Sequence, residues 1–218
     1  MSDATAAETY DAEIFIDTAC PWCWVTSRWV TNVQAERNLK VRWRFISLKF
    51  LNERNQSDYS ERHREGHLAG LKILRVLDVV RASEGNDAVG AAYTAIGTAL
   101  HNHDRFDDAL ADMNALLSEC LVSAGLDAAY AAHAEDESHD SLLRAETELA
   151  LSRTGPDVGT PIITFNPDTD AERSVFGPVI PKAPKGEDAV VLWDAVVTLA
   201  NSGVAEIKRT LRGDISFD

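Results

Sequence analysis

The sequence predicts an α/β domain that is interrupted by an all-helical insertion. Three observations support this fold class. Residues 12–46 show a strand, a helix and a second strand in succession. Residues 58–153 show helical spacing of apolar side chains and no convincing strand. Strand character returns at 161–176 before a last helix, so the order is βαβ, helical insertion, ββα.

Two short β-favouring runs define the first βαβ unit. The run IFI at 14–16 favours a strand over 12–17, because β-branched and aromatic residues fit a pleated surface. Alternating apolar and polar residues over 41–46 predict a second, half-buried strand. A helix with its apolar side chains on one side is expected over 20–37. The crossover should be right-handed, which makes the two strands parallel.

The central segment is predicted to hold four or five helices. Apolar residues recur on one face over 68–80 and again over 109–121. Breaks between helices are expected at 83–86, 102–107, 125 and 136–140. We therefore expect a discontinuous domain of residues 1–55 and 154–218, with residues 56–153 inserted as a helical domain.

The last part of the discontinuous domain completes its sheet. Residues 161–165 favour a strand, and an Asn-Pro-Asp turn at 166–168 leads to a second strand at 174–176. These two strands are expected to form a hairpin. A final helix is predicted over 187–201 from its regularly spaced apolar residues.

Composition limits the classes of partner and the compartment. The chain carries 35 acidic and 21 basic residues, a formal charge of −14, which disfavours nucleic acid and anionic membranes. It has no apolar run long enough to span a bilayer, and residues 1–10 lack the basic start of a secretory signal. Three cysteines are too few for a disulfide-stapled secreted domain. We expect a cytoplasmic protein that binds neither nucleic acid nor membrane.

The motif Cys20-Pro21-Trp22-Cys23 lies between the first strand and the first helix. A CxxC motif in that place indicates a thiol–disulfide redox centre, because residues three apart on a helical turn share one face. The helix N-terminus favours an anion, so the pKa of Cys20 is expected to be lowered. Cys20 is the predicted attacking thiolate and Cys23 the resolving thiol.

The neighbours of the motif have two possible roles each. Pro21 suits an early helical position, since it needs no partner for an N–H group there. Trp22 is either part of an apolar rim for substrate or a core side chain, whereas Trp24 is expected in the core. Asp17 either relays a proton to or from Cys23 or caps the helix that follows it.

A second site element is Thr160-Pro161, at the start of the third strand. A proline there can adopt a cis peptide bond, which exposes backbone groups of the preceding residue. The signal is weak alone, since roughly one X-Pro bond in twenty is cis in folded proteins. Together with the CxxC motif and the βαβ…ββα order, it indicates that Thr160 and Pro161 border the redox centre.

These features resemble the DsbA family of the thioredoxin-fold superfamily. Residues 17–24, DTACPWCW, look like the signature of its cytoplasmic branch, which includes FrnE-type proteins, 2-hydroxychromene-2-carboxylate isomerases and kappa-class glutathione transferases. VGTP at 158–161 looks like the cis-proline loop, and FGP at 176–178 resembles the following segment. Within the branch, the chain is similar to the mycothiol-dependent reductases, also called nitroreductases, with TSRW at 26–29 and LWDA at 192–195 in support.

The resemblance implies a thioredoxin-like fold and a thiol-dependent activity. Electrons would come from a low-molecular-weight thiol of the mycothiol type and pass through Cys20 to a disulfide or small electrophile. Asn52 matches a position that borders the substrate pocket. His63 stands where relatives tend to carry tyrosine, which changes that pocket. The isomerases carry serine in place of the first cysteine, so Cys20 argues against their activity. The resemblance does not predict the oligomeric state.

Other chemistry has less support in the sequence. A structural zinc site usually needs about four ligands, and the third cysteine, Cys120, lies on an apolar helical face typical of a core residue. His63 and His67 are four apart, but the pattern around them is not HExxH. The acidic run at 135–140 is interpreted as a solvated loop. No glycine-rich phosphate loop occurs, so we expect no metal and no tightly bound cofactor.

Two alternatives to a dithiol reductase stay open. The first is an enzyme like the glutathione transferases, which binds a thiol and an electrophile without forming a disulfide. The second is a redox-sensing or chaperone-like module whose helical insertion binds a client protein. The CxxC motif is equally compatible with an oxidant and a reductant, so the sequence does not set the direction of electron flow.

Overall fold

The computed structural model describes residues 8–53 and 59–218 of the chain. Four strands form one sheet, β1 (Ala12–Ile16), β2 (Val41–Phe45), β3 (Ile162–Phe165) and β4 (Arg173–Phe176). Their spatial order is β2-β1-β3-β4. β1 pairs with β2 in parallel, and β3 pairs antiparallel with both β1 and β4. The predicted parallel unit and the predicted hairpin are both confirmed.

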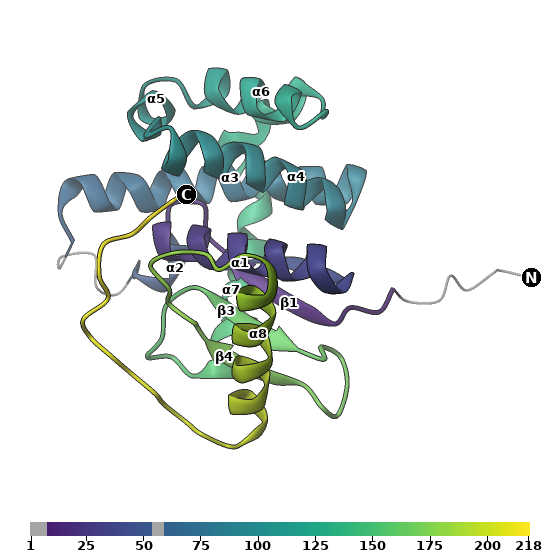
Figure 1. Cartoon of the computed structure of the whole chain (residues 1–218). Helices are drawn as coiled ribbons and strands as arrows, with labels where there is room; N and C mark the ends of the chain where they lie inside the picture. Colours follow the sequence, from purple (N-terminus) through teal and green to yellow (C-terminus); the bar gives the residue numbers. More distant parts are fainter. Residues whose placement is uncertain (1–7, 54–58) are drawn as a thin grey trace, which may run out of the picture.

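Helices surround this sheet and extend away from it (Figure 1). α1 (Pro21–Arg37) connects β1 to β2, and α8 (Gly186–Asn201) packs against α1. The segment between β2 and β3 contains the remaining helices: α2 (Leu48–Leu51), α3 (Glu61–Glu84), α4 (Asn86–Gly97), the π-helical turn η2 (Thr98–Asn102), α5 (Phe106–Ala111), α6 (Met113–Ser123), the 3-10 helices η3 (Ala128–Glu135) and η4 (Glu137–His139), and α7 (Asp140–Thr154). α5 and α6 lie at the end of the molecule opposite β4 (Figure 1).

Local chemistry explains where the first helices begin and end. Pro21 occupies the first turn of α1, where its missing N–H costs nothing. Asn38 ends α1 in the left-handed conformation, with φ of 50°, and its N–H binds the Gln34 carbonyl. Gly85 separates α3 from α4 at φ of 88°, a conformation that side chains with a Cβ rarely adopt. The predicted break at 83–86 is therefore confirmed.

The two faces of β1 belong to different apolar clusters, as the period of a strand requires. Ile14 and Ile16 face a large cluster that runs from α1 and α8 into the inserted helices, where Leu74 and Leu117 belong to it. Phe15 faces a smaller cluster that includes Ala150 of α7. The α/β fold with inserted helices is the predicted one. The domain limits stay a prediction, and the limit at 55–56 lies outside the described residues.

The acidic run at 135–140 differs from its prediction. It comprises the last residue of η3, the 3-10 helix η4 and the first residue of α7, so it is helical and not a loop, although Glu135 and Glu137 are exposed. Lys72, Arg75 and Asp78 of α3 all bind side chains of this segment. Local charge patterning did not reveal these partners, because they lie some sixty residues earlier in the chain. Among the described residues, no helix has the length and apolarity needed to cross a bilayer.

Candidate active site

The two cysteines of the CPWC motif lie at the N-terminus of α1. Cys20 is the N-cap residue, with an extended backbone at φ of −89° and ψ of 109°. Its Sγ accepts a hydrogen bond from the backbone N–H of Cys23 at 3.4 Å. Both thiols are free and buried. The first helical turn therefore aims a backbone donor at Cys20, as expected for the position of an attacking sulfur.

Burial raises the pKa of both thiols. Burial raises the pKa of Cys20, and the adjacent Cys23 adds to this effect more than the Cys23 N–H opposes it. Burial raises the pKa of Cys23 to about 11, although hydrogen bonds oppose the shift. The prediction of a lowered pKa at Cys20 is wrong for this structure. The reason is that Cys20 is only 7% exposed, so desolvation outweighs the helix N-terminus.

Cys23 lies deeper than Cys20, and its sulfur contacts several polar groups. Its Sγ lies 3.7 Å from the carbonyl oxygen of Phe15 in β1, and the hydroxyl of Tyr93 donates to it at 3.9 Å. Tyr93 is itself fully buried and comes from α4. The second thiol is thus held between the sheet and the inserted helices, away from solvent.

Thr160 and Pro161 lie beside the first thiol. The Thr160–Pro161 peptide bond is cis, as predicted. The carbonyl oxygen of Thr160 lies 3.9 Å from Cys20 Sγ, and the Thr160 hydroxyl donates to the Phe15 carbonyl at 3.3 Å. Pro161 accepts a hydrogen bond from the N–H of Gly177, which precedes a second cis proline, Pro178. The start of β3 therefore meets the CPWC motif.

Asp17 is buried beneath the motif, and its role as a cap of α1 is not observed. Oδ1 accepts from the N–H of Ala19 at 2.7 Å, and Oδ2 accepts from the N–H of Leu48, the first residue of α2, also at 2.7 Å. Burial raises the pKa of Asp17 to about 6, against these two hydrogen bonds. α3 passes so close that a Cβ on Gly70 would lie 2.8 Å from Asp17 Oδ1.

Trp22 within the motif and Trp24 directly after it differ in their surroundings. Trp24 is 2% exposed, stacks on His101 at 5.8 Å between centroids and donates from Nε1 to Asn102 at 3.0 Å. Its predicted place in the core is confirmed. Trp22 is half-buried, and the guanidinium of Arg212 lies 5.5 Å from its ring centroid. Trp22 thus has one face in the apolar cluster and one that meets the C-terminal segment.

Two further segments, which the sequence did not indicate, also reach the site. His101 in η2 lies 2.9 Å from the carbonyl oxygen of Thr18, just before the motif. Because a carbonyl only accepts, the Nε2 atom of His101 carries the proton, and burial lowers the pKa of this histidine. The ring of Phe217 lies 5.7 Å from that of His101, and its carbonyl accepts from Asn102 at 2.6 Å. No local spacing signals these contacts, since they join distant parts of the chain.

Asn52 and His63 lie in a different group of side chains. Tyr59 donates to Asn52 at 2.9 Å and its ring lies 6.2 Å from that of His63. Asn52 also donates to the carbonyl of Leu48, the residue whose N–H binds Asp17. The hydrogen bonds and ring contacts of the described residues do not join Asn52 or His63 directly to either thiol. Neither residue lines the cavity of about 800 Å³ that Trp43, Thr94 and Cys120 border.

Comparisons with solved structures agree with this fold. A putative protein disulfide isomerase from Nitrosomonas europaea matches with a TM-score of 0.57 and 15% identity, over 90% of this chain and all of that one. The cytosolic disulfide reductase DsbM from Pseudomonas aeruginosa matches with a TM-score of 0.56 and 16% identity, over 87% and 99%. The strand order and the helix that follows β1 thus define a DsbA-like thioredoxin fold.

The family is given by a more specific match. A family model described as Rv2466c-like, mycothiol-dependent nitroreductase Rv2466c, matches residues 19–209. The chain belongs to this family, and it is a thiol-dependent oxidoreductase. It is also 26% identical over 195 residues to the uncharacterized protein Rv2286c of Mycobacterium tuberculosis, a match that covers 86% of this chain and 76% of that protein.

Proposed function

We propose that the protein is a dithiol reductase that cycles Cys20 and Cys23 between thiol and disulfide. It would reduce disulfides or small electrophiles in the cytoplasm with electrons from a low-molecular-weight thiol of the mycothiol type. The observation that carries the proposal is the first turn of α1, where the Cys23 N–H donates to Cys20 Sγ at 3.4 Å. Membership of a mycothiol-dependent family supports the choice of electron donor.

With a disulfide substrate, the cycle consists of successive thiol–disulfide exchanges that begin at Cys20. Cys20 loses its proton and attacks one substrate sulfur, which forms a mixed disulfide and releases the other half as a thiol. Cys23 then attacks Cys20 Sγ, which releases the second thiol and leaves the Cys20–Cys23 disulfide. Two molecules of the donor thiol reduce that disulfide and become a disulfide themselves, so two electrons pass per turnover.

Different residues of the site would serve different steps. The N–H of Cys23 stabilises negative charge on Cys20 Sγ, the atom that attacks and later leaves. Tyr93 donates to Cys23 Sγ and so stabilises it as it becomes a nucleophile. The backbone of Thr160 and the half-buried face of Trp22 flank Cys20 and are the proposed contacts for substrate, with Pro21 and Pro161. Asn52 and His63 are proposed to contact substrate farther from the thiols, since Asn52 binds the carbonyl of Leu48 in α2.

The first test is the equilibrium reduction potential of the cysteine pair, followed by tryptophan fluorescence. A value near or below about −270 mV would mark a reductant, and one near about −120 mV would mark an oxidant and refute the proposed direction. Absence of a reversible two-electron transition would refute the dithiol cycle itself. The alternative of a transferase-like enzyme would then be favoured.

A pair of matched substitutions separates a dithiol cycle from a transferase. Cys23→Ser keeps a hydroxyl beside Phe15 and Tyr93 but removes the resolving sulfur, so we expect turnover to fall sharply and the mixed disulfide on Cys20 to accumulate. Cys120→Ser changes the third buried thiol, in α6, and should leave turnover unchanged. Mass spectrometry of the trapped protein identifies the adduct. Full turnover by the Cys23→Ser variant would refute the dithiol mechanism.

A further inference from the structure

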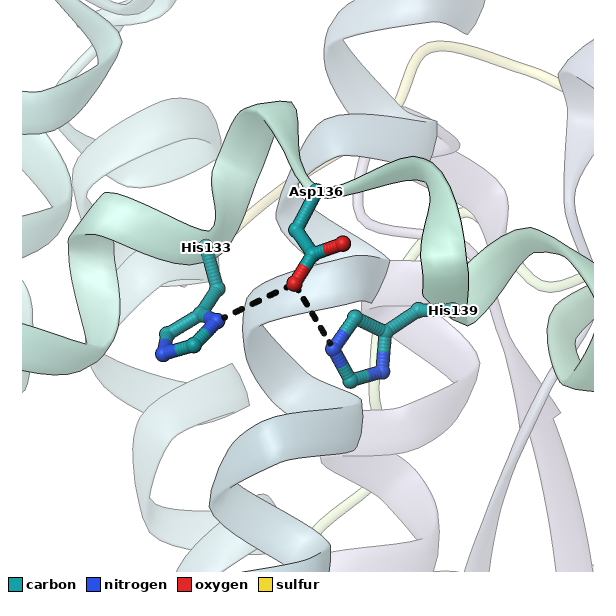
Figure 2. A group of neighbouring side chains, drawn as sticks. All are labelled: His133, Asp136 and His139. Atoms are coloured by element: carbon teal, nitrogen blue, oxygen red, sulfur yellow. Dashed lines mark ion pairs between the residues drawn. The ribbon is translucent and has the colours of Figure 1, made fainter.

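Three side chains between α6 and α7 point toward one another (Figure 2). Nδ1 of His133 lies 3.5 Å from Oδ2 of Asp136, and Nε2 of His139 lies 3.7 Å from the same oxygen. The candidate ligand atoms of the three residues all lie within 4.8 Å of one another. The thiol cycle uses none of these three residues.

The backbone of η3 and η4 produces this arrangement. His133 lies in the last turn of η3 and His139 ends η4, while Asp136 joins the two helices with an extended backbone at φ of −82° and ψ of 95°. The rings of His133 and His139 stand at 89° to each other, with centroids 6.2 Å apart. Both rings therefore present a nitrogen to the carboxylate between them without stacking on each other.

The atoms that face away from this centre are held in place. Oδ1 of Asp136 accepts a hydrogen bond from the N–H of Ser138 at 3.0 Å, which leaves Oδ2 for the centre. Nδ1 of His139 lies 2.8 Å from Oδ2 of Asp78, a carboxylate that fixes the proton on Nδ1 and leaves the lone pair on Nε2. Metal-binding histidines in proteins are oriented by carboxylates in the same way.

One helix anchors both ends of the segment. Arg75 of α3 is 4% exposed in its side chain, donates to the carbonyl of Ala134 at 3.2 Å and binds Asp140 with two hydrogen bonds of 2.7 and 2.8 Å. Lys72, one turn earlier, binds Glu135 at 2.6 Å. The charge of Arg75 is thus matched by Asp140, and the backbone on either side of Asp136 is fixed before any ion binds.

The spacing fits a small tetrahedral metal ion. Zinc binds nitrogen and carboxylate oxygen at about 2.0–2.2 Å, so two ligands of a tetrahedral site lie about 3.3–3.6 Å apart. The two separations here, 3.5 and 3.7 Å, need little change to meet that value. We propose that His133, Asp136 and His139 bind one zinc ion. A water molecule would complete the coordination, since the side chains of His133 and Asp136 are about two-fifths exposed, at 42% and 40%.

The test uses the full chain with Cys20, Cys23 and Cys120 replaced by serine, because thiolates also bind zinc. Calorimetric titration with zinc chloride at neutral pH should show one ion bound per chain. In this background, Asp136→Asn keeps the acceptor for the Ser138 N–H but removes the charge, and His133→Gln removes a ring ligand. Each should weaken zinc binding at least about tenfold, whereas His103→Gln, at an exposed histidine outside the cluster, should not.

Two further measurements test the zinc site independently of the calorimetric titration. Zinc should raise the midpoint of thermal unfolding of the serine background but not of its Asp136→Asn variant, since only the folded site binds the ion. Cobalt, used as an absorbing substitute, should give the spectrum of a four-coordinate nitrogen and oxygen site. The proposal is overturned if the serine background binds no zinc, or if Asp136→Asn and His133→Gln bind it as tightly as that background does.

Discussion

Asp17 is a fully buried carboxylate whose only hydrogen bonds, among the described residues, come from two backbone N–H groups. Burial disfavours its charged form and raises its pKa to about 6 from an ordinary value of 3.8. Because the folded state holds the proton more tightly, this group contributes stability below about pH 4. That contribution is lost as the pH rises through about 6. Its negative charge also raises the pKa of both thiols.

The change Asp17→Asn tests this behaviour. Between pH 7 and pH 4, the wild type should gain about 2 kcal/mol relative to the variant, since a tenfold change in proton affinity is worth about 1.4 kcal/mol and the unfolded carboxyl is only partly protonated at pH 4. Urea unfolding of both proteins at the two pH values measures the difference. Asparagine has only one acceptor for two N–H groups, which costs about 1–3 kcal/mol at both pH values and does not alter the pH dependence.

The control for Asp17 is Asp11→Asn, at an exposed aspartate that also accepts a backbone N–H, from Lys40. At pH 7 this variant should stay within about 0.5 kcal/mol of the wild type in its free energy of unfolding. A difference between wild type and Asp17→Asn that does not change with pH would contradict the raised pKa.

The residues of the site that could be predicted are those whose position depends on their neighbours in the sequence. The turn between β1 and α1 places Cys20 and Cys23 by short-range helical geometry, and the proline of Thr160-Pro161 is a local signal too. The ionisation of Cys20 was not predictable, because it depends on burial by distant segments such as η2 and the start of β3. Tyr93 carries no sequence signal at all, since a tyrosine on an apolar helix face is typical of any core.

Among the secondary-structure elements, a charged cluster joins the middle of the sheet to α7. Glu13 of β1 is fully buried, accepts from Arg44 Nε at 2.8 Å and from Arg153 Nη1 at 2.5 Å, and also pairs with Arg42. Burial alone would raise the pKa of Glu13, but the hydrogen bonds from Arg44 and Arg153 outweigh it and lower the pKa. Glu146 of α7 extends the cluster by accepting from Arg44 and from the N–H of Phe45.

Replacing Glu13 by glutamine should destabilise the protein by about 3–5 kcal/mol at pH 7, because it removes one partner of a buried ion pair. The lowered pKa means that this stabilisation is present at neutral pH and is lost as the pH falls below the ordinary value of 4.5. The difference between wild type and Glu13→Gln should therefore shrink in acid, the opposite of the trend for Asp17.

Chemical unfolding of the Glu13→Gln variant is best compared with Glu36→Gln, which changes an exposed glutamate of α1. That control should stay within about 0.5 kcal/mol of the wild type. An equally small effect at Glu13 would show that the cluster stabilises the sheet no more than surface charges do.

The strands and α1 were predictable to within a few residues, because each has its own apolar period, whereas the apolar face expected over 109–121 is divided at Asp112 between α5 and α6. β1, α1 and β2 begin and end close to the predicted limits, and the glycine at 85 gave the break between α3 and α4. The structure of 133–140 could not be predicted in the same way. Its conformation depends on contacts with Arg75 and Asp78 of α3. In the sequence of α3, these two charged residues cannot be told apart from residues on an ordinary solvent-exposed face.

For the whole molecule, the main unpredicted feature is the path of residues 204–218. The chain leaves α8, passes the sheet and ends beside the helices (Figure 1). The N–H of Ser216 binds the Pro181 carbonyl at 2.7 Å, Phe217 contacts η2 through His101 and Asn102, and Arg212 covers Trp22. These contacts restrain both sides of the loop that holds Cys20, since His101 binds Thr18 before it and Trp22 follows it.

Removal of residues 204–218 should therefore make Cys20 more reactive. The loop would lose its contacts on both sides, water would reach the thiol, and the desolvation that raises its pKa would fall. The measurement is the rate of alkylation by iodoacetamide at neutral pH, with Cys23→Ser and Cys120→Ser in the background so that Cys20 is the only thiol. We expect the rate to rise several-fold, since each lowering of the pKa by one unit increases the thiolate fraction about tenfold.

Two point variants in the same background identify which contact matters. Phe217→Ala removes the ring that lies against His101 and should give part of the increase seen on truncation. Leu211→Ala removes a similar apolar volume from the same segment, but its side chain is 84% exposed, so it should leave the rate unchanged. Equal alkylation rates for the full-length and truncated proteins would mean that the burial of Cys20 comes from β3 and η2 alone. In that case a substrate would have to displace those elements, and not the C-terminal segment, to reach the thiol.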